Sequence, residues 1–258
     1  MKKFYIATMG TDFQKYVKAN GTGIELDQFC MAENLEVGSF ERTADEIRKL
    51  MGETGLSGSD MVLHAPFSEL FPAAIDPEAL KLAEKRMAQA YDACRAFDIK
   101  KMVVHSGYIP DVYFKSWQTE RSVLFWTEFM KDKPEDFRLC IENVMDDEPY
   151  MMRDMMEGIR QHSGFSNIGI CLDTGHANCV SDVDVTDWIE VLSPYISHFH
   201  IHNNDGAHDQ HASFEQGTMD MAQVLETAQR LCSPDITYTV EVMECGRAVE
   251  WLRVAGWL

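Results

Sequence analysis

The sequence predicts an α/β protein of a single domain, a (β/α)8 TIM barrel that spans residues 1–258. Short apolar runs alternate with helix-like segments along the whole chain, with no linker or low-complexity break. Eight such runs within 258 residues match the usual size of a barrel of this kind. Polar residues recur near the ends of several runs, where barrel enzymes build their sites. A doubly wound sheet is the alternative.

The predicted strands are short runs rich in apolar residues. They cover residues 3–9, 23–29, 61–67, 101–105, 138–144, 168–173, 196–202 and 237–243. The predicted helices cover residues 44–51, 77–94, 117–130, 151–159, 219–231 and 247–257. Asp76 and Pro77 form the clearest helix start, because aspartate is a favourable N-cap and proline fits the first helical position.

Six polar residues lie at or near the C-terminal ends of six different predicted strands: His64, His105, Glu142, Asp173, His202 and Glu241. Buried parallel strands are otherwise apolar. Polar residues in the same relative position of several strands therefore indicate one shared site, and they favour the barrel over the doubly wound sheet.

The segment 198–211 reads HFHIHNNDGAHDQH and holds five of the nine histidines. In a strand, His198, His200 and His202 point to the same face, into the barrel. We expect His202 to reach the mouth and the other two to lie deeper as packed core residues. Asp209 and His211 follow a turn. This pattern favours a divalent-metal site over a strand of satisfied core histidines.

The strand ends supply three carboxylates (Glu142, Asp173 and Glu241) and the imidazole of His202 for one ion. This donor set suits Mn²⁺, Co²⁺, Zn²⁺ or Mg²⁺. Further candidates bring the possible ligands to nine: His64, His105, His176, Asp209 and His211. Nine ligands are too many for one ion. Either some of them orient ligands or bind substrate, or the site holds more than one ion.

Composition excludes several classes of function. The formal net charge of −19, from 23 basic and 42 acidic residues, argues against a nucleic-acid partner, because phosphate contacts require lysine and arginine. No apolar run is long enough to predict a membrane span. Seven cysteines without a C-x-x-C pair do not form a disulfide framework, which predicts a reduced, cytoplasmic protein. Exposed helix faces leave room for a homo-oligomer.

Seven short motifs resemble those of the xylose-isomerase-like barrel superfamily, which includes sugar and sugar-phosphate isomerases and epimerases and nucleases of the endonuclease IV type. They are HAP at His64, HSG at His105, IEN at Glu142, LDTGH at 172–176, HIHNNDG from His200, DQH at 209–211 and VEV at Glu241. The resemblance implies the barrel fold. It also implies that Glu142, Asp173, His202 and Glu241 match the single-metal set of the epimerases. All nine positions match the trinuclear zinc set of the nuclease. After DQH the chain reads ASFEQG, and of the usual Gly-x-Gly turn only Gly217 is kept.

Two mechanisms follow from these residues. In the first, a single divalent ion activates a small carbohydrate, and Glu142 and Glu241 act as the acid/base pair of an isomerase or epimerase that works through an enediolate. His64, His105, His176 and Arg247 would then bind substrate. Arg247 lies near a predicted helix start after the last strand, where phosphate can bind, although a solvated arginine is the simpler alternative.

In the second mechanism, up to three zinc ions activate water against a phosphodiester. A related sugar or inositol lyase is a further alternative. A barrel that only binds a sugar is disfavoured, because both glutamates are present. The strongly acidic composition favours the isomerase or epimerase.

Overall fold

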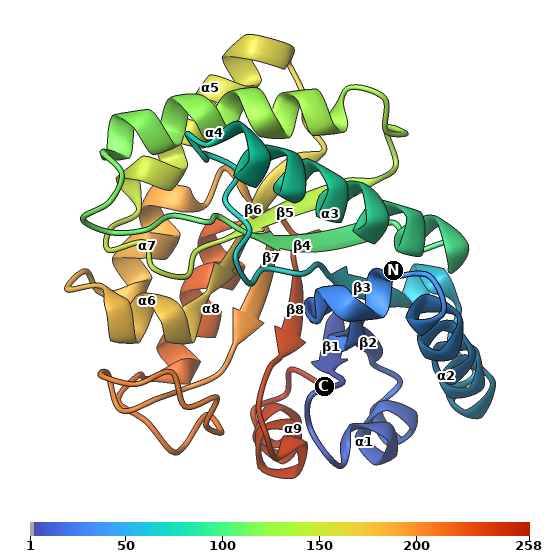
Figure 1. Cartoon of the computed structure of the whole chain (residues 1–258). Helices are drawn as coiled ribbons and strands as arrows, with labels where there is room; N and C mark the ends of the chain where they lie inside the picture. The colour runs from blue at the N-terminus through green and yellow to red at the C-terminus, as the bar shows by residue number, and fades with distance from the viewer. Residues whose placement is uncertain (1–2) are drawn as a thin grey trace.

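In the computed structural model, which describes residues 3–258, the strands form one closed parallel barrel surrounded by helices (Figure 1). Each strand pairs with the next in sequence order, and β8 pairs with β1. The strands are β1 Phe4–Ala7, β2 Gly23–Leu26, β3 Met61–His64, β4 Lys101–His105, β5 Arg138–Glu142, β6 Ile168–Asp173, β7 Ile196–Ile201 and β8 Thr237–Val240. The predicted (β/α)8 fold is confirmed.

The helices lie on the outside of the barrel (Figure 1). They are α1 Phe13–Asn20, α2 Ser39–Thr54, α3 Pro77–Ala96, α4 Lys115–Met130, α5 Tyr150–Ser163, α6 Thr174–Val180, α7 Val185–Leu192, α8 Met221–Leu231 and α9 Cys245–Val254. Three 3-10 helices, η1 Gln28–Cys30, η2 Ala32–Leu35 and η3 Gly58–Asp60, lie in the connections on either side of α2. The start of α3 is as predicted, since the Asp76 carboxylate accepts hydrogen bonds from the backbone N–H groups of Glu78 and Ala79.

Successive side chains of each strand point alternately out toward the helices and into the barrel, and they contribute to two separate buried regions. A large apolar cluster joins the outward faces of the strands to the helices. A smaller cluster contains Tyr5, Val62, Val103, Cys140 and Cys171, which alternate with the outward residues and therefore fill the barrel interior. Toward the C-terminal mouth the interior becomes polar, and this is where the candidate ligands lie.

Most predicted strands begin correctly but extend too far toward the C-terminal mouth. Beyond the C-terminal ends of the strands the backbone no longer forms the hydrogen bonds between neighbouring strands. Its N–H and C=O groups bond to other atoms instead. The backbone N–H of Met9, for example, donates to Asp27 Oδ2 at 2.7 Å. The short helices α1, α6 and α7 were not predicted, and α6 carries the candidate ligand His176. Within the described residues, every helix is too short or too polar to span a membrane.

Candidate metal centre

Parallel strands bring the predicted ligands to one mouth of the barrel. Six of them occupy the last position of a strand or one of the next positions in the chain: His64, His105, Glu142, Asp173, His202 and Glu241. His176 is contributed by the first turn of α6, and Asp209 and His211 by the loop between β7 and α8. All nine predicted ligands therefore approach from the same end of the barrel.

One group of possible ligands near the mouth consists of three carboxylates and one imidazole. The ligand atoms of Glu142, Asp173, His200 and Glu241, which we call the inner tetrad, all lie within 4.8 Å of one another. His200 Nδ1 is 3.3 Å from Glu142 Oε1 and 3.2 Å from Glu241 Oε2. Asp173 Oδ2 lies 3.8 Å from the same nitrogen. This spacing and this mixed oxygen and nitrogen set can surround one divalent cation.

His200, rather than the predicted His202, completes this group. Asp173 pairs with His200 in the register of β6 and β7, so the two side chains enter the barrel at the same level. His202 lies two residues closer to the mouth, and its Nε2 is 3.1 Å from Asp173 Oδ1. His200, which we expected to be a packed core residue, is fully buried and also faces the three carboxylates. His198 is fully buried below it, as expected.

His200 directs one ring nitrogen at the three carboxylates of the inner tetrad. Its Nε2 lies 3.0 Å from Glu25 Oε1, whereas its Nδ1 has no hydrogen-bond partner among the described residues. The side chain is fully buried, and a buried polar atom without a partner is costly. A ring nitrogen that faces three carboxylates fits a divalent cation, because an imidazole that has lost its proton and a carboxylate both coordinate one.

A second group lies on the other side of Glu142. His64 Nε2 is 3.2 Å and His105 Nε2 is 3.5 Å from Glu142 Oε2, whereas Oε1 faces His200. His64 Nδ1 lies 2.9 Å from the Ala65 carbonyl, which leaves Nε2 directed at the carboxylate. The two oxygens of Glu142 thus face different sets of imidazoles. This is the arrangement of a carboxylate that can bridge two ions.

A third group is centred on Asp209. Its Oδ2 lies 3.3 Å from His176 Nε2 and 3.2 Å from His211 Nε2, and its Oδ1 lies 3.7 Å from His202 Nε2. Asp209 is the most exposed member, with 38% of its side chain accessible. The predicted ligands outside the inner tetrad therefore form two further groups that lie on either side of it.

Backbone contacts hold the ligand-bearing segments in place. The side chain of Asn143 accepts a hydrogen bond from the Asp173 N–H at 2.8 Å and donates one to the Asp173 carbonyl at 3.0 Å. Asn203 donates to the carbonyl oxygens of Phe214 and Met219 and anchors the loop that carries Asp209. A Cβ atom at Gly217 would lie 2.1 Å from Asn203 Oδ1, so this loop needs glycine at the one position that it shares with the family turn.

The carboxylates favour the protonated form of some imidazoles in this cluster, whereas burial lowers the pKa of His105 to about 3. Burial lowers the pKa of His176 and of His200, but nearby acidic groups more than offset this and raise both pKa values well above the usual range. Burial raises the pKa of Glu142, but the imidazoles of His200 and His105 hold it well below its ordinary value. A metal ion must therefore displace protons from the imidazoles that it binds.

Positive charge in the cluster is supplied by histidine alone. Within the described residues, the carboxylates of Glu142, Asp173 and Glu241 form ion pairs only with imidazoles, and no lysine or arginine pairs with them. A phosphate group in this site would therefore have to be neutralised by bound metal ions.

Arg247 is not brought to the cluster. It lies exposed in the first turn of α9 and lines a separate pocket with Glu215, Gly246 and Trp251. Its predicted role in substrate binding gains no support from this position.

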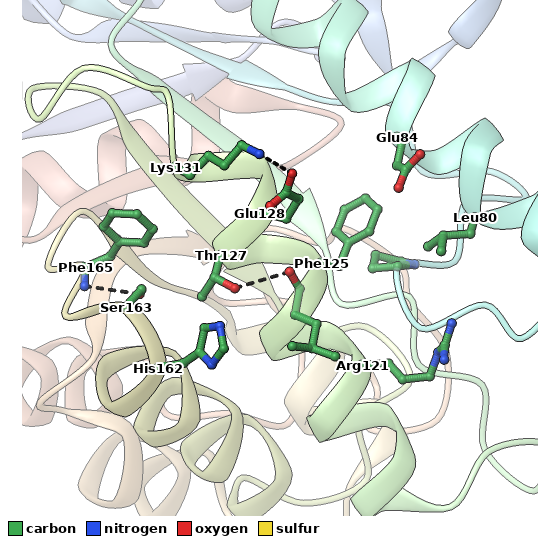
Figure 2. Close-up of a pocket in the computed structure, with 12 residues that line it drawn as sticks. Leu80, Glu84, Arg121, Phe125, Thr127, Glu128, Lys131, His162, Ser163 and Phe165 are labelled. Atoms are coloured by element: carbon green, nitrogen blue, oxygen red, sulfur yellow. Dashed lines mark hydrogen bonds and ion pairs between the residues drawn. The ribbon is translucent and has the colours of Figure 1, made fainter.

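The outer helices form another cavity, of about 550 Å³, whose lining includes none of the nine predicted ligands (Figure 2). It is lined by residues of α3, α4 and α5, including Arg121, Phe125 and His162. The carboxylate of Glu128 pairs there with Lys131, as Figure 2 shows. With one histidine and carboxylates at its rim, this cavity offers no group of ligands comparable to the inner tetrad.

Two residues of the centre were missed from the sequence. His200 was assigned to the core because strand alternation does not tell how deep a side chain lies. Glu25 was overlooked inside the apolar run that forms β2, where it is fully buried. A carboxylate within a buried parallel strand is itself unusual and could have marked the position.

The chain is similar in sequence to a known protein family and to a protein of an archaeon. The family model described as "Xylose isomerase-like TIM barrel" matches residues 13–256. An uncharacterized protein of Methanocaldococcus jannaschii is 27% identical over 186 residues, which cover 67% of this chain and 61% of the relative. The match thus spans less than two thirds of that relative's length.

Solved structures share the fold. The crystal structure of a D-tagatose 3-epimerase-like protein has a TM-score of 0.76 at 23% identity, and the match covers 99% of this chain and 96% of that one. A protein from Thermus thermophilus whose crystal was soaked with ZnCl2 has a TM-score of 0.72 at 21% identity, with 98% of each chain covered. Other structures with this fold are named as a D-psicose 3-epimerase, a probable 3-DHS dehydratase and a family 2 AP endonuclease.

Proposed function

Because the chain belongs to the xylose isomerase-like TIM barrel family, we propose that it is a divalent-metal-dependent isomerase or epimerase of a small carbohydrate. The observation that carries this proposal is the inner tetrad, in which Nδ1 of His200, without a hydrogen-bond partner among the described residues, faces three carboxylates. Two structural neighbours are named for sugar epimerisation, which supports a carbohydrate as substrate.

Glu142 and Glu241 are the proposed acid/base pair. They lie on β5 and just after β8, and each has an oxygen within 3.3 Å of His200 Nδ1, so they approach one point from different strands. One carboxylate would remove the proton next to the substrate carbonyl, and the other would return a proton to the opposite face or to the neighbouring carbon. A cation held by the inner tetrad would acidify that C–H bond and stabilise the enediolate.

The charge of the site favours an uncharged, hydroxyl-rich substrate. Among residues 3–258, the carboxylates of the inner tetrad pair only with imidazoles, and the whole chain carries a formal charge of −19. The more exposed members of the cluster, His105, Asp209 and His211, lie nearest to solvent and offer hydrogen-bonding groups to sugar hydroxyls. Nucleic acid is a poor partner for so acidic a protein.

A second candidate is the hydrolysis of a small phosphate ester by a multinuclear site. The observation that favours it is the position of Glu142, whose two oxygens face different groups of imidazoles. Together with the group around Asp209, this arrangement offers places for up to three ions. Several ions held there would neutralise a phosphate and lower the pKa of water. In this case Glu142 would serve as a bridging ligand and not as a base.

Metal content and proton exchange test the two candidates together. Protein without a polyhistidine tag, purified without chelators, would be analysed for metal and then incubated in D2O with a panel of ketoses and with small phosphate esters. We expect about one Mn²⁺, Co²⁺, Zn²⁺ or Mg²⁺ per chain and deuterium incorporation next to a sugar carbonyl, which Glu142→Gln abolishes. About three zinc ions, with phosphate release and no exchange, would establish the second candidate instead.

A further inference from the structure

A carboxylate that takes no part in the proposed chemistry lies beneath the inner tetrad. Glu25, in the middle of β2, is fully buried, and its side chain points into the barrel. Its Oε1 lies 3.0 Å from His200 Nε2, and its Oε2 lies 3.2 Å from His198 Nε2. The Thr239 hydroxyl also donates to Oε2. A buried charge is tolerated when its oxygens are hydrogen-bonded in this way.

The direction of these hydrogen bonds is set from the floor of the barrel. Lys101 Nζ donates to Thr237 Oγ1, because an ammonium group has no acceptor. The hydroxyl proton of Thr237 is therefore free to point at His198 Nδ1, 2.6 Å away. With Thr237 donating, Nδ1 of His198 accepts, and the proton of the ring lies on the other nitrogen, Nε2. That proton faces two acceptors, Thr239 Oγ1 at 2.9 Å and Glu25 Oε2 at 3.2 Å, and the Thr239 hydroxyl itself donates to Glu25 Oε2.

The same logic extends to His200. Both neighbouring donors to Glu25, His198 and Thr239, already engage Oε2, and Oε1 remains for His200 Nε2. A carboxylate accepts but cannot donate, so this contact requires the proton of His200 to lie on Nε2. The lone pair of the neutral ring is then on Nδ1, the atom that faces Glu142, Asp173 and Glu241.

We propose that Glu25 is a positioning residue, which fixes the tautomer and the ring orientation of His200 so that Nδ1 coordinates the metal. Carboxylates that accept the second N–H of a metal-bound histidine commonly act in this way. The inference rests on the metal centre of the proposed function, but it does not depend on which reaction the centre catalyses.

Replacing Glu25 by glutamine separates this role from simple packing. The amide has nearly the same volume, but only one of its two ends can accept a hydrogen bond. If its NH2 group faces His200, it donates to Nε2 and favours the opposite tautomer, in which Nδ1 carries the proton. Thr239→Val is the matched control, because it removes a hydrogen bond from Glu25 while leaving the contact with His200 in place.

The experiment measures Co²⁺ affinity by titration calorimetry on folded wild-type protein, Glu25→Gln and Thr239→Val. We expect Glu25→Gln to weaken binding about 10- to 100-fold and to change the absorption spectrum of the bound Co²⁺, with Thr239→Val within about threefold of wild type. Equal affinity and equal spectra for wild type and Glu25→Gln would overturn the proposal.

If Glu25→Gln does not fold, the tautomer can be read directly from ¹⁵N NMR of the histidines in zinc-loaded wild-type protein, with His200 assigned by comparison with His200→Gln. A proton on Nε2 supports the proposal, and a proton on Nδ1 overturns it. Wild type that binds no divalent metal would overturn this inference and the proposed function together. Metal binding that depends on Glu25, without isomerase or epimerase activity on any sugar of the panel, would overturn the proposed function alone.

Discussion

Asp173 Oδ1 accepts a hydrogen bond from the backbone N–H of His176 at 2.6 Å, so one carboxylate both caps α6 and belongs to the inner tetrad. The strand β6 ends at the residue that starts the helix, which leaves the side chain no freedom to leave the site. Burial raises the pKa of Asp173, but His176 and His202 more than offset this and hold the pKa at about 2. This carboxylate, a candidate metal ligand, is therefore ionised and positioned by the local structure.

Mutation of Asp173 can separate its capping of α6 from its proposed part in metal binding. Asparagine is a good N-cap, whereas alanine is not, so Asp173→Ala should unfold at a free energy about 1 kcal/mol lower than Asp173→Asn. Both variants remove an ionised ligand and should bind Co²⁺ far more weakly than wild type. Denaturant unfolding without metal and calorimetric titration with Co²⁺ measure the two effects. Asp173→Asn with wild-type metal affinity would show that this carboxylate is not a ligand.

Glu142→Gln and Glu241→Gln should each lower kcat for proton exchange by a factor of about 100 to 10,000, because a glutamine can neither remove nor return a proton. The measurement is deuterium incorporation into the sugar that wild-type protein turns over. Circular dichroism serves as the control for folding, and Glu78→Gln, an exposed glutamate on α3, serves as the matched variant. Near-normal exchange in either site variant contradicts the proton-transfer mechanism.

The assignment of His200 rather than His202 to the inner tetrad predicts different behaviour for two similar variants. His200→Gln should weaken binding of the first divalent ion by about 100-fold or more, because it removes the nitrogen that all three carboxylates face. His202→Gln should leave that first ion in place. Metal titration of both proteins checks this. The reverse order of effects would restore the ligand set expected from the sequence.

Gly175 provides the space for the His202 ring. A Cβ atom at position 175 would lie 1.9 Å from His202 Cε1, so Gly175→Ala forces the ring or α6 to move. We expect a loss of about 1–3 kcal/mol in the free energy of unfolding, as for other overpacked sites. Gly52→Ala in α2 is the control, because nothing lies within 4 Å of its added Cβ and alanine favours the helix. Similar stability of the two variants would show that the site relaxes freely.

The raised pKa of Asp146 predicts that this residue makes a pH-dependent contribution to the free energy of unfolding. Burial raises its pKa to about 6 from the ordinary value of 3.8, despite a hydrogen bond from Ser106 Oγ at 2.7 Å. The folded state therefore binds more protons than the unfolded state between about pH 4 and pH 6, and this group lowers stability as pH rises through that range.

Asp146→Asn removes that titration. The stability of the variant relative to wild type should therefore increase by up to about 3 kcal/mol between pH 4 and pH 7. Urea unfolding at both pH values measures the difference. A difference between variant and wild type that does not change with pH would exclude a raised pKa at Asp146.

Much of this architecture was predictable from the chain alone. The alternation of apolar runs and helices identified the barrel, and the starts of the strands after β1 were predicted correctly. The position of polar residues at strand ends identified the C-terminal mouth as the site, because parallel strands present all their C-terminal ends on one side. The N-cap at Asp76 was recognisable because capping depends on residues only two or three positions apart.

The depth of side chains and their grouping were decided by tertiary structure. Alternation places His198, His200 and His202 on one face, but which of them reaches the level of Asp173 depends on the register between β6 and β7. The contact between Glu25 and His200 joins residues 175 positions apart, and it exists only because the barrel closes. Periodicity along a strand is a local property that the sequence determines by itself. The stagger between strands is set by the closure and packing of the whole barrel, and it decides which ligands meet.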